Sequence, residues 1–322
     1  MRRIIDVHSH CVFRDYLELV ARHGALREDG FPLPTDWSIE KQLELMDAGG
    51  IEWALVSLSS PHPYFGDSNE AKHMCRAVNE SMAEAKRRYP GRIGFGACLP
   101  LPDVDAAIEE AVYALDVLGA DSIKLASNSR GQYLGDPALE PLMAELDRRG
   151  AIVNLHPHRP EPQQEGVFSA GPVPLFEFLC DTTRAVLNMI SNGVLERHPD
   201  IKVIVPHNGS FLPNIYDRFQ MISNILVPQG LMPPVDVSGS FQRLYFDTSG
   251  NPVPSLLKFL LTVAEPSHIL YGADYPFTPK ETVLRNLDGL IAFMEEDSEL
   301  KQYKGMILYE NARRLFHVSH CR

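Results

Sequence analysis

Two histidines near the start of the 322-residue chain, His8 and His10, directly follow an apolar stretch that begins at Ile4. This stretch predicts a short buried strand. Strand side chains alternate between two faces, so residues two positions apart point the same way. Two neutral imidazoles on one side can share a metal ion such as zinc. A His-x-His pair is common by chance, so a metal site also requires ligands from elsewhere in the chain.

Further residues with suitable side chains follow later apolar stretches. His156 and His207 each end a predicted strand, and Asp274 comes just after another. Of the 12 histidines in the chain, His8, His10, His156 and His207 therefore lie just past the apolar run of a predicted strand. If those strand ends share one rim, the sequence predicts a metal-binding or catalytic cluster there.

The elements that must position these residues alternate between strands and helices. The predicted strands are residues 4–10, 53–58, 92–99, 121–126, 151–156, 201–207, 243–248 and 268–272. The predicted helices are residues 38–46, 69–88, 103–118, 136–149, 175–196, 213–224, 279–295 and 309–316. The polar, proline-rich residues 157–174 are too long for a plain connection and are a candidate lid.

Strands that are apolar throughout are typical of parallel sheets covered on both faces. Eight such units favour an α/β fold of the TIM-type (β/α)8 barrel class, distorted and extended by extra C-terminal helices, with residues 1–322 as a single domain. In such barrels the active site lies at the carboxyl ends of the strands. An open doubly wound sheet is the alternative, but no Gly-x-Gly-x-x-Gly follows the first strand.

The composition restricts the partners and the compartment. The formal net charge of −12 argues against nucleic acid or an anionic membrane as a partner. There is no long apolar span, and the N-terminus enters a core strand at once, so we expect neither a transmembrane helix nor a signal peptide. The widely spaced cysteines indicate free thiols in a reducing cytoplasm: Cys11, Cys75, Cys98, Cys180 and Cys321. We interpret Cys11 as a neighbour of the site and not as a ligand.

Several motifs span nearly the whole chain in order: DVHSH at 6–10, LHP at 155–157, FLCDTTRA at 178–185, PHNG at 206–209, YGADYP at 271–276 and NARRLF at 311–316. With these motifs the chain resembles the amidohydrolase superfamily. More narrowly, it resembles the branch containing aminocarboxymuconate-semialdehyde decarboxylase and aromatic-acid decarboxylases, such as those for resorcylate and methylsalicylate. Some relatives carry Glu where this chain has His8, and many carry a small residue where it has Asn208.

The resemblance implies one divalent metal ion per chain, bound by His8, His10, His156 and Asp274. Three imidazoles and one carboxylate favour zinc, with manganese as the alternative. His207 would stand beside the metal and transfer a proton or polarise a bound group, although it can also be read as a fourth histidine ligand. Asp274 would both bind the metal and move a proton. Relatives of this kind are commonly homodimers or homotetramers.

Other residues near these motifs have less specific expectations. We interpret Asp6 as supporting the site from behind. Some amidohydrolases use a carbamylated lysine to bridge two metals, but this branch typically does not. We therefore expect Lys124 to be a buried lysine with a structural partner.

The substrate side is less clearly marked. Arg159 follows the His156 turn and is a candidate for binding a substrate carboxylate, with Arg14 and Arg184 as competitors. Each arginine can equally well form an ordinary ion pair. Phe13 and Phe277 flank the predicted rim and can stack on a substrate ring or simply form its wall.

The function indicated first is metal-dependent, non-oxidative decarboxylation of an aromatic or muconate-like carboxylic acid. The alternative is hydrolysis of an amide, ester or lactone, or hydration of a double bond, by a metal-activated water. A binding protein with a structural metal is a third possibility. The additional His207 and the long 157–174 loop argue against it, because structural sites are closed and commonly rich in cysteine.

Overall fold

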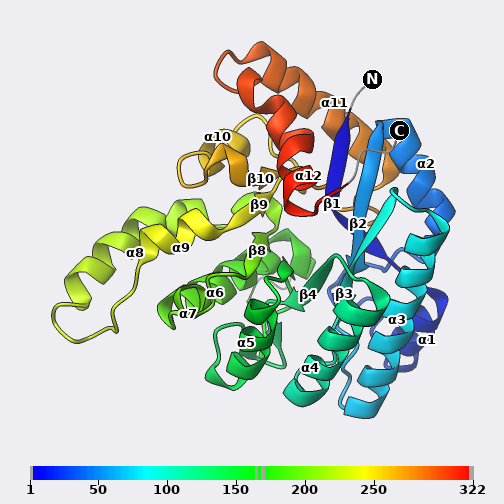
Figure 1. Cartoon of the computed structure of the whole chain (residues 1–322), viewed down its shortest axis with the longest axis horizontal. Helices are drawn as coiled ribbons and strands as arrows, with labels where there is room; N and C mark the ends of the chain where they lie inside the picture. The colour runs from blue at the N-terminus through cyan, green and yellow to red at the C-terminus, as the bar shows by residue number, and fades with distance from the viewer. Residues whose placement is uncertain (1–2, 164–165, 168–170, 319–322) are drawn as a thin grey trace.

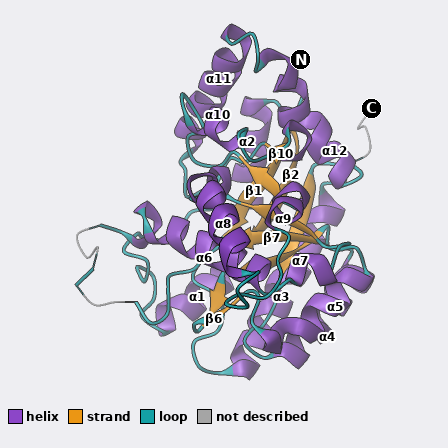
Figure 2. Cartoon of the chain, turned by 90° about the vertical axis from the view of Figure 1, so that its left-hand side faces the viewer, coloured by secondary structure: helices purple, strands orange, loops and turns teal. Residues whose placement is uncertain are grey.

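The computed structural model describes residues 3–163, 166–167 and 171–318. Eight parallel strands form one sheet in chain order, and helices surround them (Figures 1 and 2). The strands are β1 Ile4–Cys11, β2 Ile51–Leu58, β3 Ile93–Cys98, β4 Ser122–Ala126, β7 Ile152–His156, β8 Lys202–Val205, β9 Tyr245–Asp247 and β10 Ile269–Leu270. A small antiparallel hairpin, β5 Asn128–Ser129 and β6 Gln132–Tyr133, follows β4. The predicted barrel with eight strands is confirmed.

The helices cover the outside of the sheet. They are α1 Arg14–Arg22, α2 Ile39–Gly49, α3 Ser68–Arg88, α4 Val104–Tyr113, α5 Glu140–Arg148, α6 Glu177–Ser191, α7 Val194–Arg197, α8 Leu212–Leu226, α9 Val237–Arg243, α10 Leu256–Leu260, α11 Lys280–Glu296 and α12 Asn311–Leu315. Several begin at a polar cap, as in α2, where the Ser38 side chain accepts a hydrogen bond from the backbone N–H of Lys41, and in α4, where Asp103 caps Ala106. Among the described residues, no helix combines the length and the apolar character needed to cross a bilayer.

Three differences from the predicted elements have local causes. The predicted helices do not include α1, α9 and α10, because helices of nine, seven and five residues are too short to show a clear helical period in the sequence. The predicted helix 175–196 is divided into α6 and α7, since Gly193 adopts a left-handed conformation with φ of 65° between them. β10 is shorter than the predicted 268–272, because the chain after Leu270 leaves β9 and turns toward β1.

The segment after β10 closes the barrel. Three backbone hydrogen bonds join it to β1: Val7 N–H to Tyr271 O at 2.9 Å, Asp274 N–H to His8 O at 2.7 Å, and His10 N–H to Tyr275 O at 2.7 Å. A parallel bridge between Ser9 and Tyr275 accompanies them. The first strand and residues 271–275, far apart in the sequence, are thereby held side by side.

A glycine makes this close approach possible. A Cβ atom on Gly272 would lie 2.8 Å from the His8 Cβ and 3.2 Å from the Asp247 Cγ, closer than side chains normally pack. Any larger residue at this position would push the closing segment away from β1.

An apolar cluster fills part of the barrel, and the C-terminal helix covers it. Ile5 and Trp53, near the starts of β1 and β2, pack together with Leu270, and Ala312 and Leu315 of α12 complete the cluster. The extra C-terminal helix therefore seals the region near the strand starts. The carboxyl ends of the strands are left for the site.

Candidate active site

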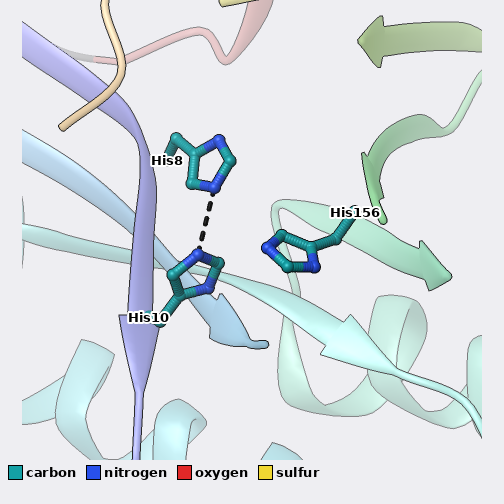
Figure 3. A group of neighbouring side chains, drawn as sticks. All are labelled: His8, His10 and His156. Atoms are coloured by element: carbon teal, nitrogen blue, oxygen red, sulfur yellow. Dashed lines mark hydrogen bonds between the residues drawn. The ribbon is translucent and has the colours of Figure 1, made fainter. Parts of the chain in front are cut away.

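Three histidines from two strands converge at the carboxyl ends of the barrel strands. His8 and His10 lie on β1 and His156 lies at the end of β7, and their rings point toward one another (Figure 3). The His8 Nε2 and His10 Nε2 atoms are 3.0 Å apart. One ring nitrogen from each of the three lies within 4.8 Å of the other two, and all three residues are buried. The predicted convergence of strand ends therefore brings these histidines together.

Each of the three rings is held from behind by an oxygen that can only accept a hydrogen bond. The His8 Nδ1 donates to Asp247 Oδ2 at 2.7 Å, the His10 Nδ1 to Ser57 O at 3.3 Å, and the His156 Nδ1 to Pro157 O at 2.9 Å. These acceptors fix the proton of each neutral ring on Nδ1, so the Nε2 lone pairs face one another. Three lone pairs directed at one place repel unless a cation lies between them. The donor set therefore fits a metal ion.

Asp247 is the residue that the sequence reasoning missed. Its Oδ2 orients His8, while its Oδ1 accepts hydrogen bonds from the backbone N–H of His207 at 3.1 Å and from the Ser249 hydroxyl at 2.6 Å. Asp247 thus connects the histidine cluster to the loop that carries His207. A polar residue at the end of the predicted strand 243–248 was the available signal, and it is the same signal that identified His156.

The charges around His8 favour a cation at this position. Burial disfavours a charge on the ring, but the charge and hydrogen bond of Asp247, together with the charges of Asp274 and Asp6, raise the pKa of His8 to about 9. Burial also opposes ionisation of Asp247, but the charge and hydrogen bond of His8 lead the contributions that lower its pKa to about 2. Burial and the nearby His8 lower the pKa of His10 to about 4. A proton on His8, or a metal ion in its place, therefore balances the carboxylates.

Asp274 arrives at the cluster on the segment that closes the barrel. Its Oδ1 lies 3.2 Å from His10 Nε2 and 3.6 Å from His8 Nε2. Burial opposes ionisation, but the neighbouring His10 and the charge of His8 keep the pKa of Asp274 below its usual range. Its backbone is in the left-handed region, with φ of 58°, which costs free energy for a residue other than glycine. Asp274 is thus an ionised carboxylate held against two of the three histidines.

His207 lies next to the cluster on a strained loop. Its ring centroid is 5.3 Å from that of His8 and 6.1 Å from that of His156. Both His207 and Asn208 have φ near 55°. Burial, followed by the charge of His8, lowers the pKa of His207, and its Nδ1 has no hydrogen-bond partner within the described part of the chain. A nitrogen of His207 also lies within 4.8 Å of ligand atoms of His8 and Asp274, so its geometry suits either a neighbour or a ligand of a metal.

A cavity of about 440 Å³ opens onto this cluster. His156, His207 and Asp274 are part of its wall. Much of the remaining wall is apolar, and includes Phe31, Leu33, Phe178, Phe211, Leu256 and Phe277. Volume and lining are those of a site for a small organic ligand with one polar end.

The structure separates the predicted substrate-binding residues. Phe277 lines the cavity and meets His10 edge to face, with 5.4 Å between the ring centroids. Phe13 does not reach the cavity, because it directly precedes α1 and packs against Trp37. Arg159 points to the Glu28 carboxylate, 3.1 Å away. Arg159 is not among the described residues that line the cavity, and its role in binding a substrate carboxylate stays a prediction.

The two competing arginines are also engaged elsewhere. Arg14 pairs with Glu18 on the surface of α1, and Arg184 pairs with the buried Asp181. Among the described residues that line the cavity there is no lysine or arginine. Sequence proximity to a strand end was therefore a poor guide to which cations face the site.

Residues expected to support the site have structural contacts. Asp6 Oδ1 accepts hydrogen bonds from the backbone N–H groups of His8 and Ala273, so it joins β1 to the closing segment. The buried Lys124 donates to Ser59 O at 3.3 Å, and burial lowers its pKa to about 8. Burial raises the pKa of the Cys11 thiol, which makes it a poor metal ligand.

The candidate lid is only partly described. Residues 164–165 and 168–170 lie outside the described part of the chain, as does Cys321. On the far side of that gap, the Val173 N–H donates to Asp29 O at 2.8 Å. The end of the 157–174 segment is therefore attached to the loop that carries Asp29.

The fold and the site define a parallel barrel with a histidine-rich centre at its strand ends. A model of the amidohydrolase family matches residues 5–318, so the chain belongs to this family. It is 32% identical to the decarboxylase yanB of Aspergillus niger, over 97% of this chain and 87% of that protein. It is 31% identical to the 6-methylsalicylic acid decarboxylase of Penicillium expansum, over 90% of each.

Solved structures agree with this placement. A crystal structure described as amidohydrolase II is 36% identical and has a TM-score of 0.91, with 98% of this chain and 99% of that chain covered. A 2,6-dihydroxybenzoate decarboxylase in complex with 2,6-dihydroxybenzoate is 26% identical with a TM-score of 0.82, over 98% and 100% of the two chains. The predicted resemblance to this decarboxylase branch is confirmed.

Proposed function

We propose that this protein is a metal-dependent, non-oxidative decarboxylase, a carbon–carbon lyase that acts on an aromatic carboxylic acid. The observation that carries the proposal is the convergence of three oriented imidazoles and one carboxylate at the wall of an apolar cavity. The decarboxylases among its relatives support the reaction class.

In this proposal His8, His10, His156 and Asp274 bind one divalent metal ion per chain. Zinc suits this ligand set best, and manganese is the alternative. A dihydroxybenzoic acid decarboxylase from Polaromonas, a structural neighbour at 22% identity, contains bound manganese. The bound metal would supply a positive charge that holds the carboxylate and an adjacent oxygen of the substrate.

The chain's own groups would move the proton. Asp274, ionised at rest, accepts a proton and then donates it to the ring carbon that bears the carboxylate, or His207 delivers that proton. The carbon–carbon bond then breaks, carbon dioxide leaves, and the bonding electron pair returns to the ring. One proton is consumed for each molecule of carbon dioxide released, and no oxidant or reductant is needed.

The cavity would hold and shield the ring. The Phe277 side chain, edge-on to His10, sits where it can contact an aromatic substrate beside the metal ligands. Phe178 and Phe211 extend the apolar wall and exclude water from the reacting carbon. Phe13 and Arg159 are not among the described residues that line the cavity.

The deciding experiment compares two reactions of the same purified protein. Carbon dioxide release is measured from a panel of hydroxybenzoic acids, and acid release is measured from lactones and esters. We expect the first and not the second, with loss of activity on chelation and recovery with added zinc or manganese. Acid release without carbon dioxide would replace the decarboxylase by the hydrolase alternative. Activity that survives complete metal removal would exclude metal dependence.

We also propose the setting in which the enzyme works: one domain, in the cytoplasm, as a homodimer or homotetramer. The four described cysteines are unpaired, which supports a reducing compartment. Exposed apolar side chains on and after α8, namely Met221, Ile225 and Leu231, support self-association. Light scattering after size-exclusion chromatography tests the assembly, and a single-chain mass would contradict it.

A further inference from the structure

Two buried oxygen atoms in the cavity wall have no hydrogen-bond partner within the described residues: Asp29 Oδ1 and Asn208 Oδ1. Asp29 is 8% exposed and Asn208 is 5% exposed. A buried acceptor without a partner costs free energy, and native structures contain few of them. Both residues line the cavity, so a bound ligand is a candidate partner.

The position of Asp29 is fixed by its neighbours. Its Oδ2 accepts a hydrogen bond from the Ser60 hydroxyl at 2.8 Å, and its backbone oxygen accepts one from Val173. The next residue, Gly30, has φ of 74°, and a Cβ there would lie 3.1 Å from the Pro172 Cα. These contacts hold one carboxylate oxygen in place and leave the other, Oδ1, without a hydrogen-bond partner among the described residues.

A short series of contacts connects Asp29 to one of the proposed metal ligands. Its partner Ser60 follows Ser59, whose hydroxyl lies 3.4 Å from His156 Nε2. Asp29, Ser59, Ser60 and His156 all line the same cavity. A substrate that is held by its carboxylate at the histidine cluster, and whose ring extends past His156 and Ser59, would have part of that ring on the Asp29 side.

The charge of this side selects the kind of group that can bind there. Burial raises the pKa of Asp29 to about 6, so at pH 7 and above the group is mainly a carboxylate. The cation that acts on Asp29, Arg159, is paired with Glu28, and no lysine or arginine is found among the described lining residues, so a second substrate carboxylate would meet Asp29 without a free compensating cation. A neutral donor, in contrast, would satisfy the free oxygen.

We propose that Asp29 determines substrate specificity by accepting a hydrogen bond from a phenolic hydroxyl at a ring position other than the one beside the reacting carboxylate. The substrate is then a phenolic monocarboxylic acid and not a dicarboxylic or muconate-like acid. This inference rests on the proposed function for the placement of the reacting carboxylate. To the proposed function it adds Asp29 as a residue that determines specificity, the phenolic hydroxyl as the substrate group that Asp29 binds, and phenolic monocarboxylic acids as the substrate class.

The test measures binding, so it does not depend on turnover. Isothermal titration calorimetry with the manganese- or zinc-loaded protein compares 2-hydroxybenzoate with derivatives that carry a second substituent at ring position 3, 4 or 5. At each position a hydroxyl is compared with a methoxy group, which occupies space but cannot donate. A hydrogen bond to a charged acceptor predicts roughly ten- to a hundredfold tighter binding for the hydroxyl at one position.

Two variants and one control assign that preference to Asp29. Asp29→Ala should reduce the hydroxyl-to-methoxy ratio to about one, and the nearly isosteric Asp29→Asn should reduce it partly, because the amide oxygen still accepts but carries no charge. Glu28→Gln changes the adjacent carboxylate, which faces Arg159, and should keep the wild-type ratio. Thermal unfolding identifies any variant that fails to fold. If Asp29→Ala does not fold, the test relies on Asp29→Asn.

The outcomes separate this inference from the proposed function. Equal binding of hydroxyl and methoxy compounds at every position, or a preference that persists in both Asp29 variants, overturns the role of Asp29. Carbon dioxide release from the same compounds is measured in parallel. A hydroxyl preference that depends on Asp29, without any release of carbon dioxide, would support the role of Asp29 and refute the decarboxylase proposal. Release of carbon dioxide without a hydroxyl preference would support the decarboxylase proposal and refute the role of Asp29.

Discussion

The two sides of the cavity differ in how their polar groups are satisfied. On the metal side, formed by His8, His10, His156 and Asp274, every histidine has a hydrogen-bond acceptor behind its ring. On the loop side, formed by Asp29, Phe31 and Asn208, two buried oxygens lack any partner among the described residues. On the metal side the Nδ1 groups are thus satisfied within the folded protein, whereas on the loop side the two oxygens are not.

The difference follows from where each side comes from. The histidines of the metal side end barrel strands, whose backbone is fixed by pairing on both edges, and Asp274 is attached to β1 by backbone hydrogen bonds. The loop side stands on connections, which tolerate change in sequence and conformation. We therefore expect changes on the metal side to alter metal binding and reaction rate, and changes on the loop side to alter the choice of substrate.

The largest effect is expected for His207→Ala. If His207 moves a proton, its removal should lower kcat by about 10²- to 10⁴-fold while metal content stays near one per chain. Atomic emission analysis of the purified variant and its turnover rate are the measurements. A loss of metal together with activity would make His207 a ligand, and would add it to the metal side in that role.

A smaller effect is expected when the support of one ligand is weakened. Asp247→Asn removes the charge behind His8 and should reduce metal affinity by about 10- to 100-fold. A competition titration with a chelating dye measures the affinity. The exposed Asp217→Asn on α8 is the matched control and should bind metal like the wild type. Unchanged affinity in Asp247→Asn would mean that the orientation of His8 does not depend on this carboxylate.

The pH dependence of metal binding tests the charge balance of the metal side. With the pKa of His8 raised to about 9, a metal ion must displace a proton from it at neutral pH, while His10, with its pKa lowered to about 4, is already neutral. Affinity should therefore rise by about tenfold per pH unit between about pH 6 and 8. Calorimetry in buffers of different ionisation enthalpy should show about one proton released per metal ion bound. If no proton is released, the expectation that His8 is protonated at neutral pH in the metal-free protein is wrong.

The smallest effect is expected far from both sides. Glu140, which is partly exposed, binds the exposed Arg197 and the buried His198, and the hydrogen bond to Arg197 is the main cause that lowers the pKa of Glu140 to about 2. Because the folded-state pKa is depressed, its stabilising effect is present above the ordinary glutamate pKa and is lost as the pH falls through about 2. Solvent screening limits the loss of stability in Glu140→Gln at pH 7 to less than about 1 kcal/mol.

Denaturant unfolding measures that loss, and the same variant calibrates the comparison. Its metal content and substrate preference should equal those of the wild type. If a change at this distance altered either property, effects seen in the cavity variants would have to be attributed to general destabilisation.

The convergence of residues on the metal side was predictable because strand ends carry a strong signal. Apolar runs located the strands, and parallel barrels bring the carboxyl ends of strands to one rim, so His8, His10 and His156 were found without knowledge of contacts. Asp247 meets the same criterion, but it lies outside all the motifs on which the family resemblance depends.

The loop side was not predictable in the same way. Arg159 follows His156 closely, yet its partner Glu28 comes from a loop more than a hundred positions earlier in the chain. Phe13 was expected at the rim, but the unpredicted α1 begins directly after it. No local sequence pattern marks Asp29. Its distinguishing feature is that its Oδ1 atom lacks a hydrogen-bond partner, and this feature depends on how distant segments of the chain pack.

The closure of the barrel by residues 271–275 has a consequence for folding. The carboxylate of Asp274 reaches His8 and His10 only when the last part of the chain has docked against the first. An ion bound across this seam would act as a clasp, because it joins the two ends only in the native state. At a free ion concentration of a hundred times Kd, such selective binding adds about 2.7 kcal/mol to the free energy of unfolding. The concentration of free metal would therefore influence how stable the junction between the two ends of the chain is.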